Sequence, residues 1–102
     1  MGVGGKRLIV TIAVTGQSQE TNAPVSLGRV NQIILSSTES KQTFEFSIEN
    51  EKGDIVFGPR DIAVPENFIK PNLLPMGVLT MKVINPIPAS GTVTAIILTE
   101  NR

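Results

Sequence analysis

Residues 42–50, QTFEFSIEN, alternate between apolar and polar side chains, and this alternation most constrains the fold. Phe44, Phe46 and Ile48 occupy every second position, with polar residues between them. A repeat of two residues is typical of a β-strand, because successive side chains of a strand point to opposite faces. The segment therefore predicts a strand with one face in the core and one face polar.

Similar runs recur along the chain and predict further strands. The acidic glycine turn at residues 51–54, EKGD, predicts that residues 42–50 form a hairpin with the strand that follows. Residues 28–36 carry apolar side chains in both phases, which indicates a strand that is covered on both faces. The last two strands are expected to pair with each other. Besides residues 42–50, the expected strands are residues 7–15, 28–36, 54–57, 78–85 and 92–100.

Two segments break the alternation. Residues 16–23, GQSQETNA, are polar throughout and are expected to form a loop. Residues 58–77 contain four prolines, which remove backbone donors and fix φ, so that a regular element should not pass through this segment. It retains apolar residues and is expected to pack against the domain. A short strand at residues 61–64 and a single helical turn at residues 66–69 are candidates within it.

These patterns predict an all-β protein with a single antiparallel β-sandwich, jelly-roll-like or Ig-like, of six to eight strands. The sandwich domain is expected to span residues 7–102. Residues 1–6 contain three glycines and are expected to form a flexible N-terminal arm. The predicted core consists of Leu8, Val10, Ile12, Val14, Ile34, Phe44, Phe46, Ile48, Leu79, Met81, Val83 and Ile97.

The composition excludes several classes of function. The chain has no histidine, cysteine, tryptophan or tyrosine, the residue types that supply many catalysts near neutral pH, soft metal ligands and aromatic ligand platforms. We therefore expect no enzyme activity, no cofactor and no metal. Nine basic residues balance nine acidic ones, whereas a nucleic-acid-binding protein usually has a basic excess. No apolar run reaches the roughly 18 residues of a membrane helix.

Two groups of acidic residues were weighed as candidate sites. Glu45 and Glu49 share the polar face of one strand, but four residues at about 3.3 Å each separate them by about 13 Å. Glycosidases place their two carboxyl groups about 5–10 Å apart, so a solvated strand face is the favoured interpretation. Asn50, Glu51 and Asp54 offer oxygen ligands at a hairpin tip, but without the spacing of a calcium loop. An ordinary turn is favoured there.

Basic residues suggest a third candidate. Lys6, Arg7 and Arg29 would form a patch if the strands that carry them are neighbours. A phosphate site would need aromatic stacking or a larger excess of positive charge. All four aromatic residues are phenylalanines, three of them on or near apolar strand faces, which favours the core for them.

The order of these signals resembles that of a known group of proteins. The segments LGRVNQIILSS, GDIVF and SGTVTAIIL, with a proline-rich segment before the closing strands, are similar to the small β-sandwich virion proteins of tailed bacteriophages. That group includes capsid decoration (cement) proteins and minor head and neck proteins. The resemblance implies a non-catalytic clamp that binds many copies of a shell protein, often as a trimer.

We therefore hypothesise a non-enzymatic structural protein of a bacteriophage virion, assembled in the host cytoplasm. It would be a decoration or cement protein that self-associates, with a trimer favoured, and docks on the major capsid protein. The alternative is a carbohydrate- or cell-surface-binding module of a tail or fibre, which usually needs exposed tryptophan or tyrosine. Neither nucleic acid nor a membrane is an expected partner. The expected partner-binding residues lie in the arm and the proline-rich segment: Lys6, Arg7, Pro59, Arg60, Pro65, Phe68, Pro71, Leu74 and Pro75.

Overall fold

Eight β-strands account for most of the chain that the computed structural model describes, which is residues 5–23, 29–64, 67–71 and 78–100. These residues contain no helix. The strands are β1 (Gly5–Ala13), β2 (Ser18–Ala23), β3 (Arg29–Ser37), β4 (Gln42–Glu49), β5 (Ile55–Val64), β6 (Asn67–Ile69), β7 (Leu79–Ile87) and β8 (Thr92–Glu100).

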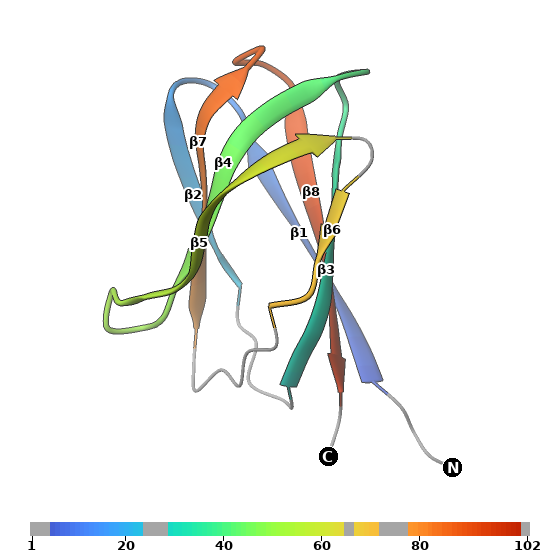
Figure 1. The fold of residues 1–102 in the computed structure, drawn as a ribbon, viewed down its shortest axis with the longest axis vertical. Coiled ribbons are helices and arrows are strands. Elements are labelled where there is room, and N and C mark those ends of the chain that lie inside the picture. Colours follow the sequence, from blue (N-terminus) through green and yellow to red (C-terminus); the bar gives the residue numbers. More distant parts are fainter. Residues whose placement is uncertain (1–4, 24–28, 65–66, 72–77, 101–102) are drawn as a thin grey trace.

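The strands form two four-stranded antiparallel sheets that face each other (Figure 1). Sheet A has the order β1-β8-β3-β6 and sheet B the order β2-β7-β4-β5. The expected antiparallel β-sandwich is thus confirmed. Eight strands connected in this order form a jelly roll, one of the two topologies expected from the sequence.

Of two predicted strand pairings, one is confirmed and the other is wrong. β4 and β5 pair as the predicted hairpin, with Glu49 opposite Ile55. The expected pairing of the last two strands is wrong, because β7 pairs with β2 and β4 while β8 pairs with β1 and β3. Alternation decides which face of a strand is buried but does not say which strand lies beside it.

Residues 16–23 contain a strand where a loop was expected. In β2 the side chains of Gln19 and Thr21 are half-buried and Ala23 is buried, while the residues between them are exposed. The inward amide of Gln19 is satisfied, since it donates to the carbonyl oxygen of Val83 at 2.8 Å and its oxygen accepts from the amide of Gly16 at 3.1 Å. A polar edge strand forms here because its inward polar group has partners.

The proline-rich segment is also more regular than expected. β5 continues through Pro59 to Val64 and so extends the predicted strand at residues 61–64. It accommodates proline because it is an edge strand and its register with β4 shifts between Phe46 and Ile48. Gly58 has a φ of +80°, and a Cβ there would collide with the carbonyl oxygen of Phe46. The candidate helical turn at residues 66–69 is wrong, because residues 67–69 form β6 against β3.

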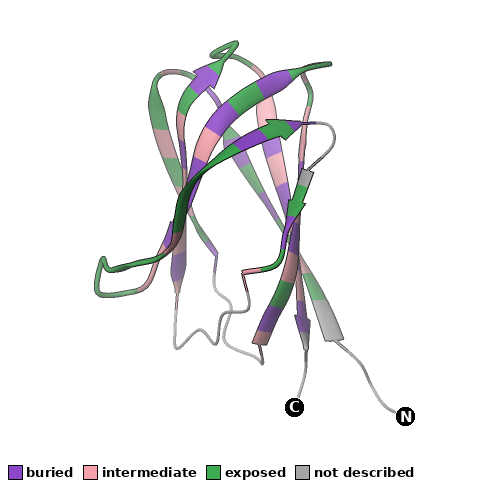
Figure 2. Cartoon of the chain, in the orientation of Figure 1, coloured by how far each residue is buried: buried purple, intermediate pink, exposed green. Residues whose placement is uncertain are grey.

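The core lies between the sheets and follows the alternation of the strands (Figure 2). Of the predicted core, Leu8 is only half-buried at the margin and Ile34 is misplaced. The register of β3 with β8 shifts between Val30 and Gln32, so that Val30, Ile33 and Leu35 face the core and Ile34 faces outward. A bulge inserts one residue and thereby reverses the facing of those that follow. The ten confirmed core residues are Val10, Ile12, Val14, Phe44, Phe46, Ile48, Leu79, Met81, Val83 and Ile97.

The bulge predicts different costs for two adjacent isoleucines. Ile33→Ala removes a fully buried side chain and should lower the free energy of unfolding by about 2–5 kcal/mol. Ile34→Ala truncates a half-buried, outward side chain and should cost about 1 kcal/mol or less. Urea denaturation of the two variants measures the difference. Equal costs would contradict the facing that the bulge creates.

A buried glutamine joins two loops at the upper end of the sandwich in Figure 1. The amide nitrogen of Gln42 donates to the carbonyl oxygens of Pro88 at 2.7 Å and Ser90 at 2.9 Å. Its amide oxygen accepts from the hydroxyl of Ser37 at 2.6 Å. The side chain of Gln42 thus connects the start of β4 and the end of β3 to the segment between β7 and β8.

Gln42→Leu should destabilise the protein, because it leaves two carbonyl groups and one hydroxyl without their partner. An unsatisfied buried polar group costs about 1–3 kcal/mol, and we expect a loss in that range or above in the free energy of unfolding. Lys41→Leu, at the exposed neighbouring position, should stay within about 0.5 kcal/mol of the wild type. Similar values for both variants in urea denaturation would refute a structural role for the Gln42 amide.

Candidate interaction surface

Sheet A carries a row of apolar side chains on its outer face. Ile9 of β1 lies opposite Ile96 of β8, Ile96 lies opposite Ile34 of β3, and Ile34 lies opposite Phe68 of β6. Neighbours across a sheet point to the same face, so these four side chains form one line across all four strands. We call Ile9, Ile96, Ile34 and Phe68 the apolar row.

The two ends of the apolar row are the most accessible. Ile9 is 56% exposed and Phe68 is 55% exposed, because they lie on the two edge strands of the sheet. Ile34 and Ile96 are half-buried between them. The Nζ atom of Lys70 lies 5.9 Å from the centre of the Phe68 ring, so a cation borders this end. An exposed line of large apolar groups on a sheet face is typical of a surface that binds another macromolecule.

The residues beside the apolar row are not acidic, and all but Leu98 are polar. On one side the register places Arg7, Leu98 and Gln32 in line across β1, β8 and β3. On the other side it places Thr11, Thr94 and Ser36 in line. Neither line contains an acidic residue, whereas the outer face of sheet B is rich in them.

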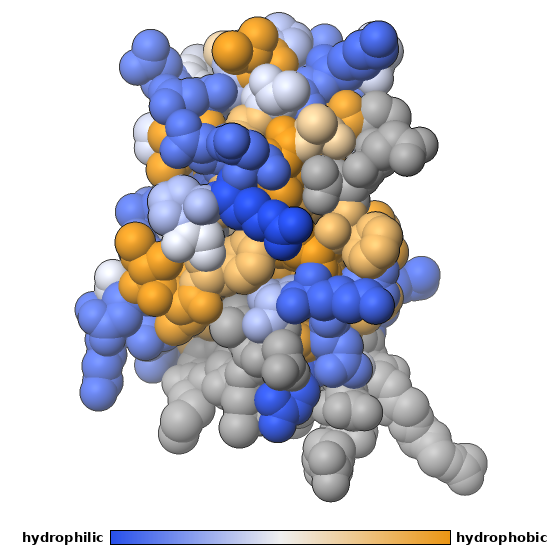
Figure 3. All heavy atoms as spheres, viewed as in Figure 1, coloured by the Kyte–Doolittle hydropathy of each residue, from blue (hydrophilic) through white to orange (hydrophobic). Residues whose placement is uncertain are grey.

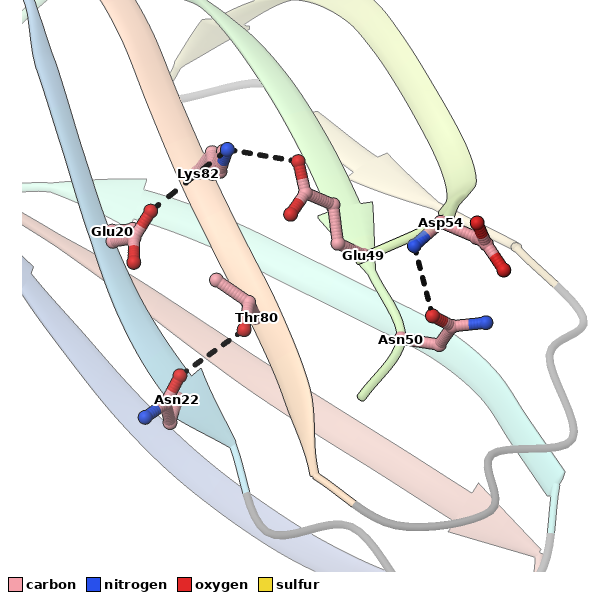
Figure 4. Close-up of polar contacts among 7 residues, drawn as sticks. All are labelled: Glu20, Asn22, Glu49, Asn50, Asp54, Thr80 and Lys82. Atoms are coloured by element: carbon pink, nitrogen blue, oxygen red, sulfur yellow. Dashed lines mark hydrogen bonds and ion pairs between the residues drawn. The ribbon is translucent and has the colours of Figure 1, made fainter. Parts of the chain in front are cut away.

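The outer face of sheet B is held together by charged contacts (Figure 4). The Nζ atom of Lys82 on β7 lies 2.8 Å from a carboxylate oxygen of Glu49 on β4 and 3.9 Å from one of Glu20 on β2. The hydrogen bond that Lys82 donates to Glu49 is the main cause that raises the pKa of Lys82 above its usual value, although desolvation acts in the opposite direction. Thr80 donates to Asn22 at 3.1 Å on the same face.

The acidic candidates from the sequence are engaged in these and similar contacts. Glu49 pairs with Lys82, and Glu45 accepts from the side-chain amide of Asn85 at 3.3 Å. The oxygen of the Asn50 side chain accepts from the backbone amides of Lys52 and Asp54, both at 2.9 Å, and so closes the hairpin turn. These contacts agree with the favoured interpretation of both groups. Among the residues that the structure describes, no group of three acidic side chains could hold a metal ion.

The predicted partner-binding residues are divided between the two sheets. Arg7 and Phe68 both lie on the outer face of sheet A, at opposite edges and in neighbouring lines. Pro59 and Arg60 are exposed on β5 in sheet B, and Pro71 is half-buried just after β6. Lys6 lies in β1, opposite Thr99, and its side chain lies outside the described part. Pro65, Leu74 and Pro75 also lie outside the described residues.

The strands that would bring together the basic residues are close but not adjacent. β1, with Lys6 and Arg7, and β3, with Arg29, lie on either side of β8. Arg29 is opposite Glu100 of the intervening strand, so an acidic residue separates the basic ones.

Sequence reasoning missed Ile9 and Ile96 and assigned Ile34 to the core. The signal was present as three apolar triplets: Leu8-Ile9-Val10, Ile33-Ile34-Leu35 and Ile96-Ile97-Leu98. Three consecutive apolar residues in a strand must place at least one on each face of the sheet. Each triplet therefore contributes one member of the apolar row, and only the register shows that the three members align.

A second, smaller apolar area lies at the start of β5. Ile55 is 56% exposed and Val56 is 36% exposed in the hairpin that projects at the left of Figure 1. Figure 3 shows hydrophobic atoms gathered over this hairpin, apart from those over β6. Ile87, at the other end of sheet B, is the most exposed large apolar residue of the described chain at 71%. These residues do not align across several strands.

Comparisons with known proteins support the fold. No protein-family model and no curated protein sequence matches the chain. Among solved structures, the chain is similar to YomS, a protein derived from the SPBc2 prophage, with a TM-score of 0.57 and 11% identity over 97% of both chains. It is also similar to the NLP-core of Drosophila, whose crystal structure concerns pentamer formation and histone binding. That match has a TM-score of 0.53 and 17% identity over 90% of this chain and 95% of the other.

These similarities establish a shared fold only. At 11% and 17% identity they show a common β-sandwich fold, and one of the two proteins has a phage origin. A shared fold does not by itself specify an activity. The described residues contain no helix that could cross a membrane.

The charged contacts on sheet B predict a change of stability in alkaline solution. A lysine whose pKa is raised by folding stabilises the protein below its unfolded pKa, and this contribution is lost as the pH rises through the folded pKa. Wild type should therefore exceed Lys82→Gln in free energy of unfolding at pH 7, and the two should converge as the pH rises beyond the usual lysine pKa of about 10.4. Urea denaturation at several pH values measures this, with Lys52→Gln at an exposed turn as the control. A difference that is unchanged at alkaline pH would contradict it.

Proposed function

We propose that this protein is a non-enzymatic structural protein of a bacteriophage virion that decorates the capsid shell. It would act as a cement by self-association and by docking on the major capsid protein. This proposal joins the resemblance of the sequence to small phage virion proteins with the likeness of the fold to the prophage protein YomS.

The observation that carries the proposal is the difference between the two outer faces of the sandwich. The middle of the outer face of sheet B is polar and internally paired, as expected for a face in contact with water, and its exposed apolar residues, Ile55 and Ile87, lie at its ends. The outer face of sheet A has the apolar row, bordered by Leu98 and by neutral polar and basic side chains. A protein that acts by binding other proteins needs an interaction surface. The core of such a surface is depleted in charged residues, as the apolar row is.

The proposed docking surface is therefore the outer face of sheet A, with Phe68 as its most accessible aromatic group. Large aromatic side chains in the centre of an interface often supply a disproportionate share of the binding energy. A shell carries many identical sites, so modest affinity for each site is sufficient when copies are linked to one another. The trimer that the resemblance implies remains a prediction.

The proposal predicts a selective effect of Phe68→Ser. Loss of the ring should weaken binding to the shell by about tenfold, which corresponds to about 1.4 kcal/mol. Co-sedimentation with empty shells assembled from the major capsid protein of the virus of origin measures the binding. Ile55→Ser is the matched control, because Ile55 has the same exposure but lies on β5 of sheet B. It should bind within about twofold of the wild type.

Two outcomes would count against the proposal. Failure of the wild-type chain to sediment with the shells would remove the docking function. Equal losses of shell binding for Phe68→Ser and Ile55→Ser would show that docking does not depend on the outer face of sheet A. Binding to a glycan array together with the first outcome would favour the alternative, a carbohydrate-binding module of a tail or fibre.

A further inference from the structure

The two sheets have four edge strands, and three of them are poorly suited to pairing with another chain. β6 has only three residues. β5 contains Pro59 and two shifts of register, which interrupt its hydrogen-bonding pattern. β2 has six residues and carries polar side chains on its outer face, including the charged Glu20. Short edges, prolines, irregularities and charges are the features by which proteins prevent edge-to-edge association.

Of these features β1 has only charge, at Lys6 and Arg7 near its start. It runs for nine residues from Gly5 to Ala13 without proline, and its register with β8 is unbroken from the first residue to the last. Within the described residues β1 pairs only with β8, so its other edge presents backbone groups that another strand can bind. Five of its residues, from Leu8 to Ile12, are aliphatic or threonine, which favour extended structure.

We propose that a second copy of this chain pairs with the free edge of β1, antiparallel, across a two-fold axis at Ile9. The two copies would form one continuous sheet of eight strands. This inference rests on the self-association in the proposed function and specifies how it occurs. An isologous contact of this kind uses the same edge of both copies and closes with two subunits.

The register of the pair follows from the position of Ile9 in the strand. Ile9 is the midpoint of β1, so centring the axis on it pairs all nine residues, with Gly5 opposite the partner's Ala13. Moving the axis to any other residue shortens the pairing. Residues directly opposite each other in an antiparallel pair point to the same face, so both outer faces of sheet A lie on one side.

The same register extends the apolar row. Ile9 is exposed because the row ends there at the edge of the sheet. With the axis at Ile9, its side chain lies beside the partner's Ile9, and the two rows join into one line of eight apolar residues from Phe68 to the partner's Phe68. This line spans the combined face that is proposed to dock on the shell.

The charges of β1 are compatible with this pairing. Arg7 lies opposite the partner's Thr11, and the two copies of Arg7 are four residues apart along the strands, about 13 Å at 3.3 Å per residue. Like charges directly opposite each other would destabilise a cross-strand pair, and this register keeps the two copies of Arg7 apart. The formal net charge of the chain is zero, so the copies carry no net charge that would oppose their approach.

The area of the contact sets its expected strength. An edge of nine residues is about 30 Å long and roughly 10 Å deep, and two such edges cover about 600 Å² in total. Stable interfaces usually bury about 1,200–2,000 Å², so the pair should be weak in dilute solution. It should become populated when many copies are held close together on a shell, where the effective concentration is high.

The absence of cysteine from the chain allows a direct test by disulfide trapping. Ile9→Cys places the two introduced thiols opposite each other, within the Cα separation of about 4.4–6.8 Å that a disulfide needs. Under mild oxidation this variant should form covalent dimers at least tenfold faster than Thr11→Cys, whose two thiols are four residues apart. An equimolar mixture of Arg7→Cys and Thr11→Cys should form the mixed dimer preferentially, because residue 7 lies opposite residue 11.

The outcomes separate this inference from the proposed function. Equal trapping of Ile9→Cys and Thr11→Cys, or a solution mass of three copies, would overturn the two-fold pairing of β1. If trapping follows the predicted register, the inference stands whether or not the chain binds shells. If trapping fails while wild-type protein still sediments with shells in a manner that depends on Phe68, the docking function stands and the pairing of β1 is wrong.

Discussion

The structure depends on the burial of one face of each sheet against the other. The side chains that fill this space are almost all aliphatic, with Phe44 and Phe46 in edge-to-face contact at a centroid distance of 6.5 Å. The chain has no cysteine for a disulfide, so packing and backbone pairing must supply its stability. Within the two sheets, four strands are paired on both sides: β8 and β3 in sheet A, and β7 and β4 in sheet B.

Burial of the inner faces leaves the two outer faces free to differ. Lys82 and the carboxylates beside it make the outer face of sheet B a solvated surface with its own contacts. The outer face of sheet A presents the apolar row instead. The two outer faces of the sandwich thus differ in polarity, and this difference supports the proposed role in assembly.

Much of the fold was predictable, and the failures have specific causes. Alternation located most strands and ten of the twelve predicted core residues, because a single buried face imposes a period of two. It failed at Ile34, where a bulge between Val30 and Gln32 changes the facing without any sign in the local pattern. It failed at β2, whose polar sequence forms a strand because the Gln19 amide finds partners across the sheet. Of the candidate contact residues, Arg7 and Phe68 come to one face, whereas Ile9 and Ile96 were missed.

The sequence by itself determined the class of fold and the chemistry that the chain lacks. Period-two alternation depends only on neighbouring residues, and the absence of histidine, cysteine, tryptophan and tyrosine is a matter of composition. Only the tertiary structure decided which strands pair and in what register, because pairing joins residues far apart in the chain. That register aligns Ile9, Ile96, Ile34 and Phe68 from four separate segments, so the apolar row exists only in the folded protein.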